Sequence, residues 1–418
     1  MMNNASRFSH YRCSLCGKDY EPSQRLYVCP VDGGNLDVIL DIPAIRAAGA
    51  RENILSGAEN SLWRYLPLLP VADPGLAGTA LRLAGGTPLL RPQTLEKELG
   101  VHSLLVKDEG RNPSASFKDR ASAVVVARAL EIGASTVVTA STGNAGAALA
   151  CMAAAAGLPA VIFAPKTAPP AKVAQLLVFG AKVILVDGNY DSAFDLTVQA
   201  AAEFGWYCRN TGYNPFTVEG KKTAAFEIWE QVLLPRQSSR PLVVFVSVGD
   251  GNIISGVHKG FKDLMDLGWL DQMPHIIGVQ SRGSAAIANA FMAGNENIIP
   301  VKADTLADSI SVDLPRDGVR AVRAARETGG TYLLVEDTEI LQAIAALGKA
   351  GIFAEPAGAA AYAGLRQAVM TGLVTPGDEV VVMNTGSGLK DIRAAMQAVT
   401  PAPVIDPDLK SLKKHLGI

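Results

Sequence analysis

The chain has 418 residues, of which 49% are hydrophobic, and a formal net charge of −2. A chain of this length and apolar content can bury a large core and should form two or three domains. The near-neutral charge argues against a nucleic-acid partner. No apolar run reaches the roughly 18 residues that a membrane-spanning helix needs, and residues 1–10 lack the apolar core of a signal peptide. We therefore expect a cytoplasmic protein without membrane or nucleic-acid partners.

Three cysteines near the N-terminus have the spacing of a zinc ribbon. Cys13 and Cys16 form a Cys-x-x-Cys pair, Cys29 follows farther along, and Asp32 stands where a fourth thiolate is typical. Thiolate sulfur and carboxylate oxygen both bind zinc, so these four residues are candidate ligands of a structural metal. A degenerate ribbon that keeps its fold without metal is the alternative. Either way, residues 1–40 are predicted to form a zinc-ribbon-like module.

The segment 112–120, with the sequence NPSASFKDR, sets Lys118 just behind a turn. Asn-Pro and small residues disfavour a helix, whereas the Ala- and Val-rich stretch that follows favours one. Lys118 is therefore predicted near a helix N-terminus, where the positive end of the helix dipole disfavours the ammonium form and helps to free a reactive amine. A solvated surface lysine at the start of a helix is the alternative.

Three later segments have the pattern of an apolar strand followed by a turn of small residues. The turns are 140–146 (ASTGNAG), 249–256 (GDGNIISG) and 384–391 (NTGSGLKD). The first two precede predicted helices, whose N-termini can bind a carboxylate or a phosphate. The second turn matches neither the dinucleotide-binding nor the P-loop pattern. A reactive lysine with two anion-binding turns and a hydroxyl at Thr385 is what a pyridoxal phosphate enzyme needs.

In this order and spacing, the four segments resemble the threonine synthases, within the fold-type II (tryptophan synthase β-like) pyridoxal phosphate enzymes. Residues 112–120 resemble that family's NPTGSFKDR motif, and residues 385–391 resemble its TGxGLKD motif. Segments 305–310 and 351–360 match as well. The resemblance runs from about residue 13 to about residue 397. It implies pyridoxal 5'-phosphate as cofactor and a homodimer.

The resemblance also implies roles for the matched residues. Lys118 would form the Schiff base with the cofactor and then move protons at the substrate carbons. Asn144 would hydrogen-bond the phenolic oxygen of the cofactor, and Thr385 would face its pyridine nitrogen. The residues expected to hold the cofactor phosphate are Gly249, Asp250, Gly251, Asn252 and Ile253. Those expected to hold the substrate carboxylate are Ser141, Thr142 and Gly143.

The reaction implied for this family converts O-phospho-L-homoserine and water into L-threonine and phosphate, by γ-elimination and β-addition of water. The γ-phosphate of that substrate needs a second anion site beside the cofactor. Lys172, Ser116 and Asn189 are the candidates, and Lys172 lies in a segment that resembles the family's GKxAQ. A lysine on a helix surface is the alternative for Lys172.

Two departures from the family pattern leave other functions open. Ser114 and Ala115 stand where Thr-Gly is common, and Asn144-Ala145-Gly146 stands where other small residues are common. Another fold-type II enzyme is therefore an alternative: a cysteate synthase-like or other β-replacement enzyme, or a threonine dehydratase. A non-enzymatic zinc-ribbon protein with a decayed domain is a third hypothesis, which the intact Lys118 disfavours.

The remaining pattern is repetitive αβ, which predicts two domains with parallel-type sheets flanked by helices. Strand candidates recur near Val137, Val161, Val183, Val243, Ile276, Leu333 and Val380. We expect a small domain over residues 135–213, inserted into a large domain of residues 41–134 and 214–400, with a C-terminal tail at 401–418. Ligands should bind where the strands end, in the cleft between the two domains.

Overall fold

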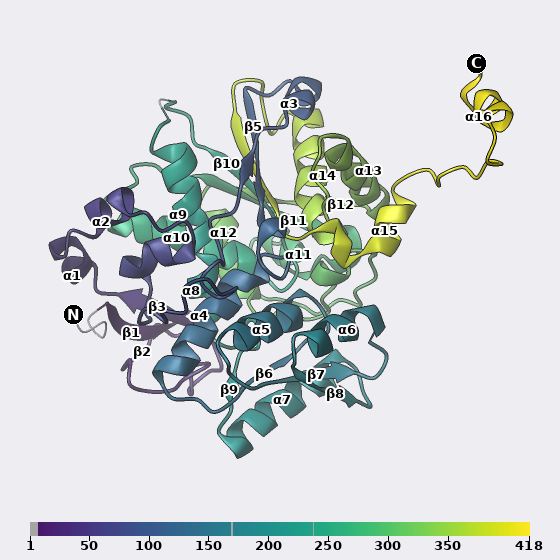
Figure 1. The fold of residues 1–418 in the computed structure, drawn as a ribbon. Helices are drawn as coiled ribbons and strands as arrows, with labels where there is room; N and C mark the ends of the chain where they lie inside the picture. The colour runs from purple at the N-terminus through teal and green to yellow at the C-terminus, as the bar shows by residue number, and fades with distance from the viewer. Residues whose placement is uncertain (1–6, 169, 237) are drawn as a thin grey trace.

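The computed structural model describes residues 7–168, 170–236 and 238–418. It has a small N-terminal sheet and two larger sheets flanked by helices, which confirms the predicted α/β class (Figure 1). Residues 1–6, at the start of the predicted ribbon module, lie outside the described residues.

The N-terminal module is a three-stranded antiparallel sheet in the order β2, β1, β3. Its strands are β1 (Phe8–Cys13), β2 (Asp19–Tyr20) and β3 (Leu36–Leu40). The loops between the strands carry the remaining cysteines of the predicted ribbon and Asp32. The predicted N-terminal module is thus present as a small sheet with a cysteine cluster.

The larger sheet has six strands in the order β12, β11, β10, β13, β5, β4. Neighbouring strands are parallel except β4 and β5, which are antiparallel. The strands are β4 (Leu89–Leu90), β5 (Ser103–Asp108), β10 (Val243–Ser247), β11 (His275–Ser281), β12 (Thr331–Val335) and β13 (Glu379–Asn384).

Both faces of this sheet are buried, because helices cover each of them. Side chains alternate along a strand, so β13 contributes Val380 and Val382 to one core and Val381 and Met383 to the other. On the first face lie α13 (Asp337–Lys349) and α14 (Pro356–Met370), and on the second lie α10 (Asn252–Asp266) and α12 (Gly318–Glu327).

The smaller sheet has four parallel strands in the order β8, β7, β6, β9. The strands are β6 (Val137–Ala140), β7 (Ala160–Pro165), β8 (Lys182–Val186) and β9 (Tyr207–Cys208). One face packs on α5 (Asn144–Ala155) and α6 (Pro170–Val178), and the other packs on α7 (Tyr190–Phe204). The strands fall within the range 135–213 expected for a small domain, and the domain boundaries themselves stay a prediction.

The remaining helices connect or cover these sheets. They are α1 (Ile42–Ala47), α2 (Ala50–Ser56), α3 (Gln93–Leu99), α4 (Lys118–Glu131), α8 (Phe216–Lys221), α9 (Thr223–Ile228), α11 (Ala286–Met292), α15 (Ile392–Gln397) and α16 (Leu409–Leu416). In the described part of the chain, no helix combines the length and the apolar character that crossing a membrane requires.

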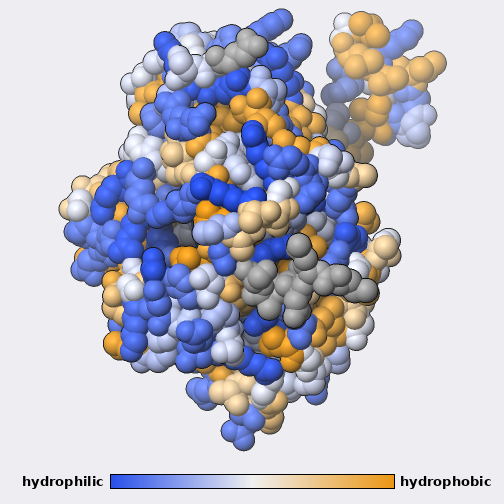
Figure 2. Space-filling model, turned by 90° about the vertical axis from the view of Figure 1, so that its left-hand side faces the viewer, coloured by the Kyte–Doolittle hydropathy of each residue, from blue (hydrophilic) through white to orange (hydrophobic). Residues whose placement is uncertain are grey.

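The C-terminal segment after α15 leaves the body of the protein and ends in α16 (Figure 1). Helix α16 buries none of its residues, and Leu409 is 72% exposed. In Figure 2 the same segment stands clear of the body, and hydrophobic residues on the face shown are interspersed with hydrophilic ones. The segment therefore adds nothing to the cores of the two larger sheets.

A buried ion-pair network joins α4 to the larger sheet. The guanidinium of Arg120 lies 2.7 Å from Glu109 and 2.6 Å from Glu227, and Nζ of Lys107 lies 2.6 Å from Glu227. Two cations thus face two carboxylates, and all four side chains are almost completely buried. Arg120 lies two residues after Lys118, in the first turn of α4. This network therefore fixes that turn.

Replacing Glu227 by alanine should leave Lys107 without a carboxylate and Arg120 with only one. Removing one partner of a buried network costs about 3–5 kcal/mol of unfolding free energy, which urea denaturation would measure. Arg91→Ala is the control, since Arg91 pairs with Glu96 at the surface and its loss should leave stability near that of the wild type. A loss below about 1 kcal/mol for Glu227→Ala would show that the network is not needed.

Candidate active site

A cavity of 490 Å³ opens where several strands end. Its wall includes Ser141 after β6, Pro165 at the end of β7, Asn189 after β8 and Ser247 at the end of β10. The ends of parallel strands are the usual place for a ligand in this fold class. The predicted site residues on the wall are Lys118, Ser141, Thr142, Gly143, Asn144, Asn189, Gly249, Asp250, Gly251, Asn252 and Ile253.

A smaller neighbouring cavity of 100 Å³ is lined by Lys172 and Lys390. It shares Thr142, Gly143 and Asn144 with the first cavity, so the two are adjacent. Of the predicted residues, Ser116 and Thr385 line neither cavity. Both are buried.

Lys118 is the first residue of α4, as predicted, and is half-buried. The turn before it pairs with the turn after β13, because the N–H of Phe117 donates to the carbonyl of Thr385 at 2.9 Å and Ser116 bridges to Gly386. Thr385 is thus fixed beside the lysine through its backbone.

Ala115 shows how this chain accommodates its departure from the family motif. Its φ of +66° lies in the left-handed region, which costs a residue other than glycine roughly 1–2 kcal/mol. Its N–H donates to the carbonyl of Asn112 at 2.7 Å, and its carbonyl accepts from Ser387 at 3.1 Å. The two hydrogen bonds hold the conformation that glycine would adopt more readily.

Burial, followed by the positive charge of Arg209, lowers the pKa of Lys118 from 10.5 to about 8. A neutral amine is therefore much more available than in an exposed lysine. The predicted effect of the helix N-terminus acts in the same direction.

The loop after β10 forms a backbone cradle at the N-terminus of α10. Gly251 caps this helix with a φ of +90°, and a Cβ there would lie 2.5 Å from the carbonyl of Asp317, so only glycine fits. No side chain of the described residues caps α10 at this position, which leaves its first N–H groups available to an anion.

The two polar side chains of this loop are turned into the protein. Asn252 accepts from Lys221 and donates to Asp317 at 2.7 Å. Asp250 accepts from the backbone N–H of Arg316 at 2.6 Å, and burial raises its pKa to about 7.

The loop after β6 places Asn144 at the start of α5. Its amide donates to Glu355 at 2.7 Å and to Ser309 at 3.4 Å. Burial raises the pKa of Glu355 to about 7. Asn144 and Glu355 therefore form a polar pair at the junction of the two cavities.

The sequence did not identify Lys221, Arg209 or Glu355 as site residues. Lys221 lines the larger cavity and is fully buried, and burial together with the charge of Lys118 lowers its pKa. Arg209 is fully buried beside Thr211 of the cavity wall. The adjacent pair Lys221 and Lys222 in an apolar stretch was the one local signal, and Glu355 lies in a segment that was matched but given no role.

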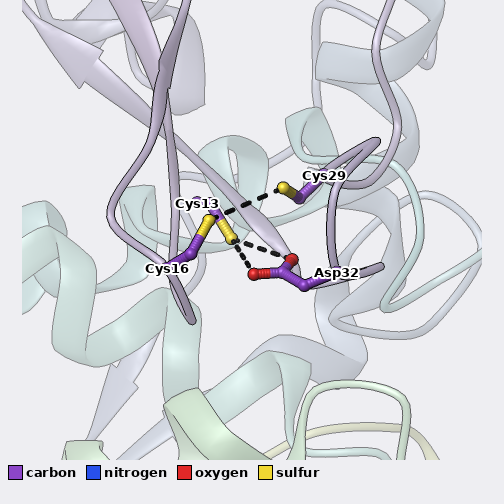
Figure 3. A group of neighbouring side chains, drawn as sticks. All are labelled: Cys13, Cys16, Cys29 and Asp32. Atoms are coloured by element: carbon purple, nitrogen blue, oxygen red, sulfur yellow. Dashed lines mark hydrogen bonds between the residues drawn. The ribbon is translucent and has the colours of Figure 1, made fainter.

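The four predicted metal ligands come together in the N-terminal module (Figure 3). Their ligand atoms all lie within 4.8 Å of one another. The thiol of Cys13 lies 3.3 Å from Asp32, and the sulfurs of Cys16 and Cys29 lie 3.8 Å apart. Three thiols and a carboxylate could therefore hold a zinc ion.

The larger cavity fits pyridoxal phosphate on its own chemistry. An amine with a lowered pKa, at Lys118, and an uncapped helix N-terminus, at α10, face the same space. The amine of Lys221 donates to the side chain of Asn252, the first residue of that helix. An aldehyde that carries a phosphate is the kind of molecule that these groups can hold together.

Adding pyridoxal phosphate to cofactor-free protein should give a covalent adduct whose rate of formation depends on pH. The neutral amine increases with pH up to the pKa of about 8, so the rate should rise toward that pH and then level off. Visible absorbance and the mass of the borohydride-reduced protein would follow the reaction. Lys118→Ala should form no such adduct. A rate that still climbs toward pH of about 10 would indicate an ordinary lysine instead.

Comparison with known proteins identifies the family of this chain. The model of the family "Pyridoxal-phosphate dependent enzyme" matches residues 80–386. The threonine synthase of Methanocaldococcus jannaschii is 40% identical over 408 residues, which are 97% of this chain and 98% of that protein. That of Methanosarcina acetivorans is 37% identical over 410 residues, again 97% and 98%.

Among solved structures, the processed form of threonine deaminase isoform 2 from Solanum lycopersicum has a TM-score of 0.65 at 22% identity. It covers 85% of this chain and 88% of its own, and this likeness shows the fold alone. The family match and the near full-length relatives carry the assignment. The chain belongs to the pyridoxal-phosphate-dependent enzymes and, among them, to the threonine synthase family.

Proposed function

We propose that the chain converts O-phospho-L-homoserine and water into L-threonine and phosphate. The observation that carries this proposal is the 40% identity to a threonine synthase over nearly the whole of both chains. The cavity supports it, because Lys118 and the cradle at α10 face one space, and a second cavity with two lysines in its wall lies beside it.

Pyridoxal phosphate, when bound, supplies an electron sink that stabilises negative charge on the substrate. Lys118 is the residue that we propose to move protons at Cα and Cβ. Its pKa of about 8 lies near neutral pH, so the amine can both take up and release a proton. Thr385 is proposed to face the pyridine nitrogen. A hydroxyl there does not enforce a protonated ring, which suits elimination and replacement.

The two helix N-termini on the cavity wall are proposed to hold the two carboxylate- or phosphate-type groups. The first N–H groups of α10 would bind the cofactor phosphate. The turn of Ser141, Thr142 and Gly143 would bind the substrate carboxylate, since Gly143 caps α5 without a side-chain hydrogen bond among the described residues. Asn144 would donate to the phenolic oxygen of the cofactor.

The γ-phosphate of the substrate needs its own cations. Lys172 pairs with Asp308 across the smaller cavity, and Lys390 donates to Gln175 at 2.9 Å on the same wall. Lys172 would exchange Asp308 for the phosphate when substrate binds. Asn189 already accepts from Ser192 at 2.9 Å to cap α7, so only its amide N–H groups remain for the substrate.

The hydroxyl of Ser116 is fully buried and has no partner among the described residues. It is the third candidate for the phosphate, and it would reach the substrate only if the turn of Lys118 shifts on binding.

Dehydratases and β-replacement enzymes of this fold act on substrates without a γ-phosphate. The lysines of the smaller cavity favour a phosphorylated substrate over those alternatives. We further propose a cytoplasmic homodimer with a ribbon module at 1–40, a large domain at 41–134 and 214–400, a small domain at 135–213 and a tail at 401–418.

Purified protein loaded with pyridoxal phosphate should release phosphate from O-phospho-L-homoserine and form threonine in equal amounts. Lys118→Ala should lower kcat by on the order of 10²–10⁴-fold, because the residue that moves the protons is gone. Phosphate and amino-acid assays measure both products. Ammonia release from threonine, with no turnover of the phosphorylated substrate, would favour a dehydratase instead.

Lys172→Ala should raise KM for O-phospho-L-homoserine by roughly tenfold to a hundredfold, the value of one hydrogen bond to a charged group. The kcat should change less, since Lys172 lies outside the cavity of Lys118. Steady-state kinetics would separate the two constants. Lys182→Ala, at an exposed lysine of β8, is the matched control. An unchanged KM for Lys172→Ala would place the phosphate elsewhere.

A further inference from the structure

The cysteine cluster of the N-terminal module has the dimensions of a metal site before any metal is added (Figure 3). With Zn–S bonds of about 2.3 Å, tetrahedral zinc sets its donor atoms roughly 3.5–3.8 Å apart. The sulfurs of Cys16 and Cys29 are 3.8 Å apart, and Cys13 Sγ lies 3.3 Å from Oδ1 of Asp32. Two opposite edges of the tetrahedron are thus already close to their final length.

Hydrogen bonds from the surrounding residues support the donor atoms. Tyr20 Oη lies 3.0 Å from the sulfur of Cys29, and the N–H of Leu15 donates to Cys13 Sγ at 3.3 Å. The N–H of Gly34 donates to Oδ1 of Asp32 at 2.9 Å, which orients the carboxylate toward the thiols. Such contacts fix ligands in place and raise metal affinity.

Glycine is required where the loop of Asp32 passes the cluster. A Cβ on Gly34 would lie 2.9 Å from Cys13 Sγ and 3.0 Å from Oδ1 of Asp32, so any side chain would enter the space of the ligands. The backbone here approaches the cluster closely, as it does around bound ions.

The same loop contacts the wall of the cofactor cavity. Asn35 follows Gly34, and its amide donates to the carbonyls of Gly212 at 2.7 Å and of Arg316 at 3.2 Å. The N–H of Arg316 in turn donates to Asp250, in the cradle before α10. Two hydrogen bonds therefore link the ribbon loop to Arg316 of the cavity wall and to Gly212, the residue after Thr211 of that wall.

A second contact ties the module to the smaller sheet. Tyr27 accepts from the N–H of Cys208 at 2.9 Å, and its ring stacks on that of Tyr213 at 4.8 Å. In the sequence, Gly212 lies between Cys208 and Tyr213. Tyr27 of the module thus contacts the chain on both sides of Gly212, at Cys208 and at Tyr213.

We propose that Cys13, Cys16, Cys29 and Asp32 bind one zinc ion, and that this ion holds the loop through which Asn35 braces the cofactor cavity. The carboxylate of Asp32 replaces the fourth thiolate of an all-cysteine ribbon. The site is structural, and its loss loosens the cradle around Asp250.

The experiment compares variants purified with zinc and pyridoxal phosphate, each measured for zinc and iron per chain by mass spectrometry and for cofactor dissociation by absorbance during dialysis. Wild type should contain about one zinc per chain. Cys16→Ser and Asp32→Asn should weaken zinc binding about tenfold or more, and cofactor dissociation should accelerate with them. Unlike Asp32→Asn, the Asp32→Cys variant should keep wild-type zinc binding and wild-type cofactor dissociation. This comparison separates loss of the metal from misfolding.

Two further variants isolate the parts of the proposal. Asn35→Ala should keep its zinc yet bind the cofactor roughly tenfold more weakly, because two hydrogen bonds to the cavity wall are lost. Asp19→Asn is the control, since Asp19 pairs with Arg12 at the surface of the same module and touches no ligand. It should match wild type in both measurements.

Several results would overturn the proposal. Wild-type protein that takes up no zinc, that forms a Cys16–Cys29 disulfide instead, or that contains equimolar iron would refute the zinc site. Zinc-free Cys16→Ser protein, or Asn35→Ala protein, that holds its cofactor as tightly as wild type would refute the link to the cavity.

Discussion

Arg120, buried between the carboxylates of Glu109 and Glu227, is the contact on which the arrangement of the site depends. A guanidinium forms several directed hydrogen bonds at once, so it fixes the first turn of α4 against Glu109, the residue after strand β5, and against helix α9. Lys118 lies two residues earlier in the same turn. A network that is costly to break therefore holds the turn that carries Lys118.

Burial then gives the cavity its chemistry. It lowers the pKa of Lys118 to about 8 and raises the pKa of Glu355 to about 7. The pKa values of Lys118 and Glu355 therefore both lie close to neutral pH. Small changes in a bound molecule can then move protons to or from these two groups. The helix N-termini supply positive potential through the backbone, which stays in place whatever the protonation of the side chains.

Much of this was predictable from local patterns, and the exceptions have a physical cause. The seven apolar strand candidates correspond to β6, β7, β8, β10, β11, β12 and β13. Strand β5 was missed because its last residues, Lys107 and Asp108, are charged. Their burial is stabilised by Glu227 and Asn384, which are far away in the sequence. The strands β4 and β9 have two residues each, too few to show a period.

At the site, the segments around Lys118, Asn144 and Gly251 could be recognised from the sequence. In each of them, the candidate residues are neighbours within one short turn. Glu355, Lys221 and Arg209 were not, since their roles arise from burial against residues far away in the sequence. The sequence likewise grouped Cys13, Cys16, Cys29 and Asp32, but the brace from Asn35 to Gly212 and Arg316 exists only in the folded chain.

We propose that Lys118 and the N-terminus of α10 hold one cofactor between them. A crystal structure of the protein grown with pyridoxal phosphate tests it most directly. We expect electron density continuous with Nζ of Lys118, with the phosphate against the backbone of residues 249–253. Cofactor density joined to another lysine, or a phosphate bound away from that backbone, would contradict it.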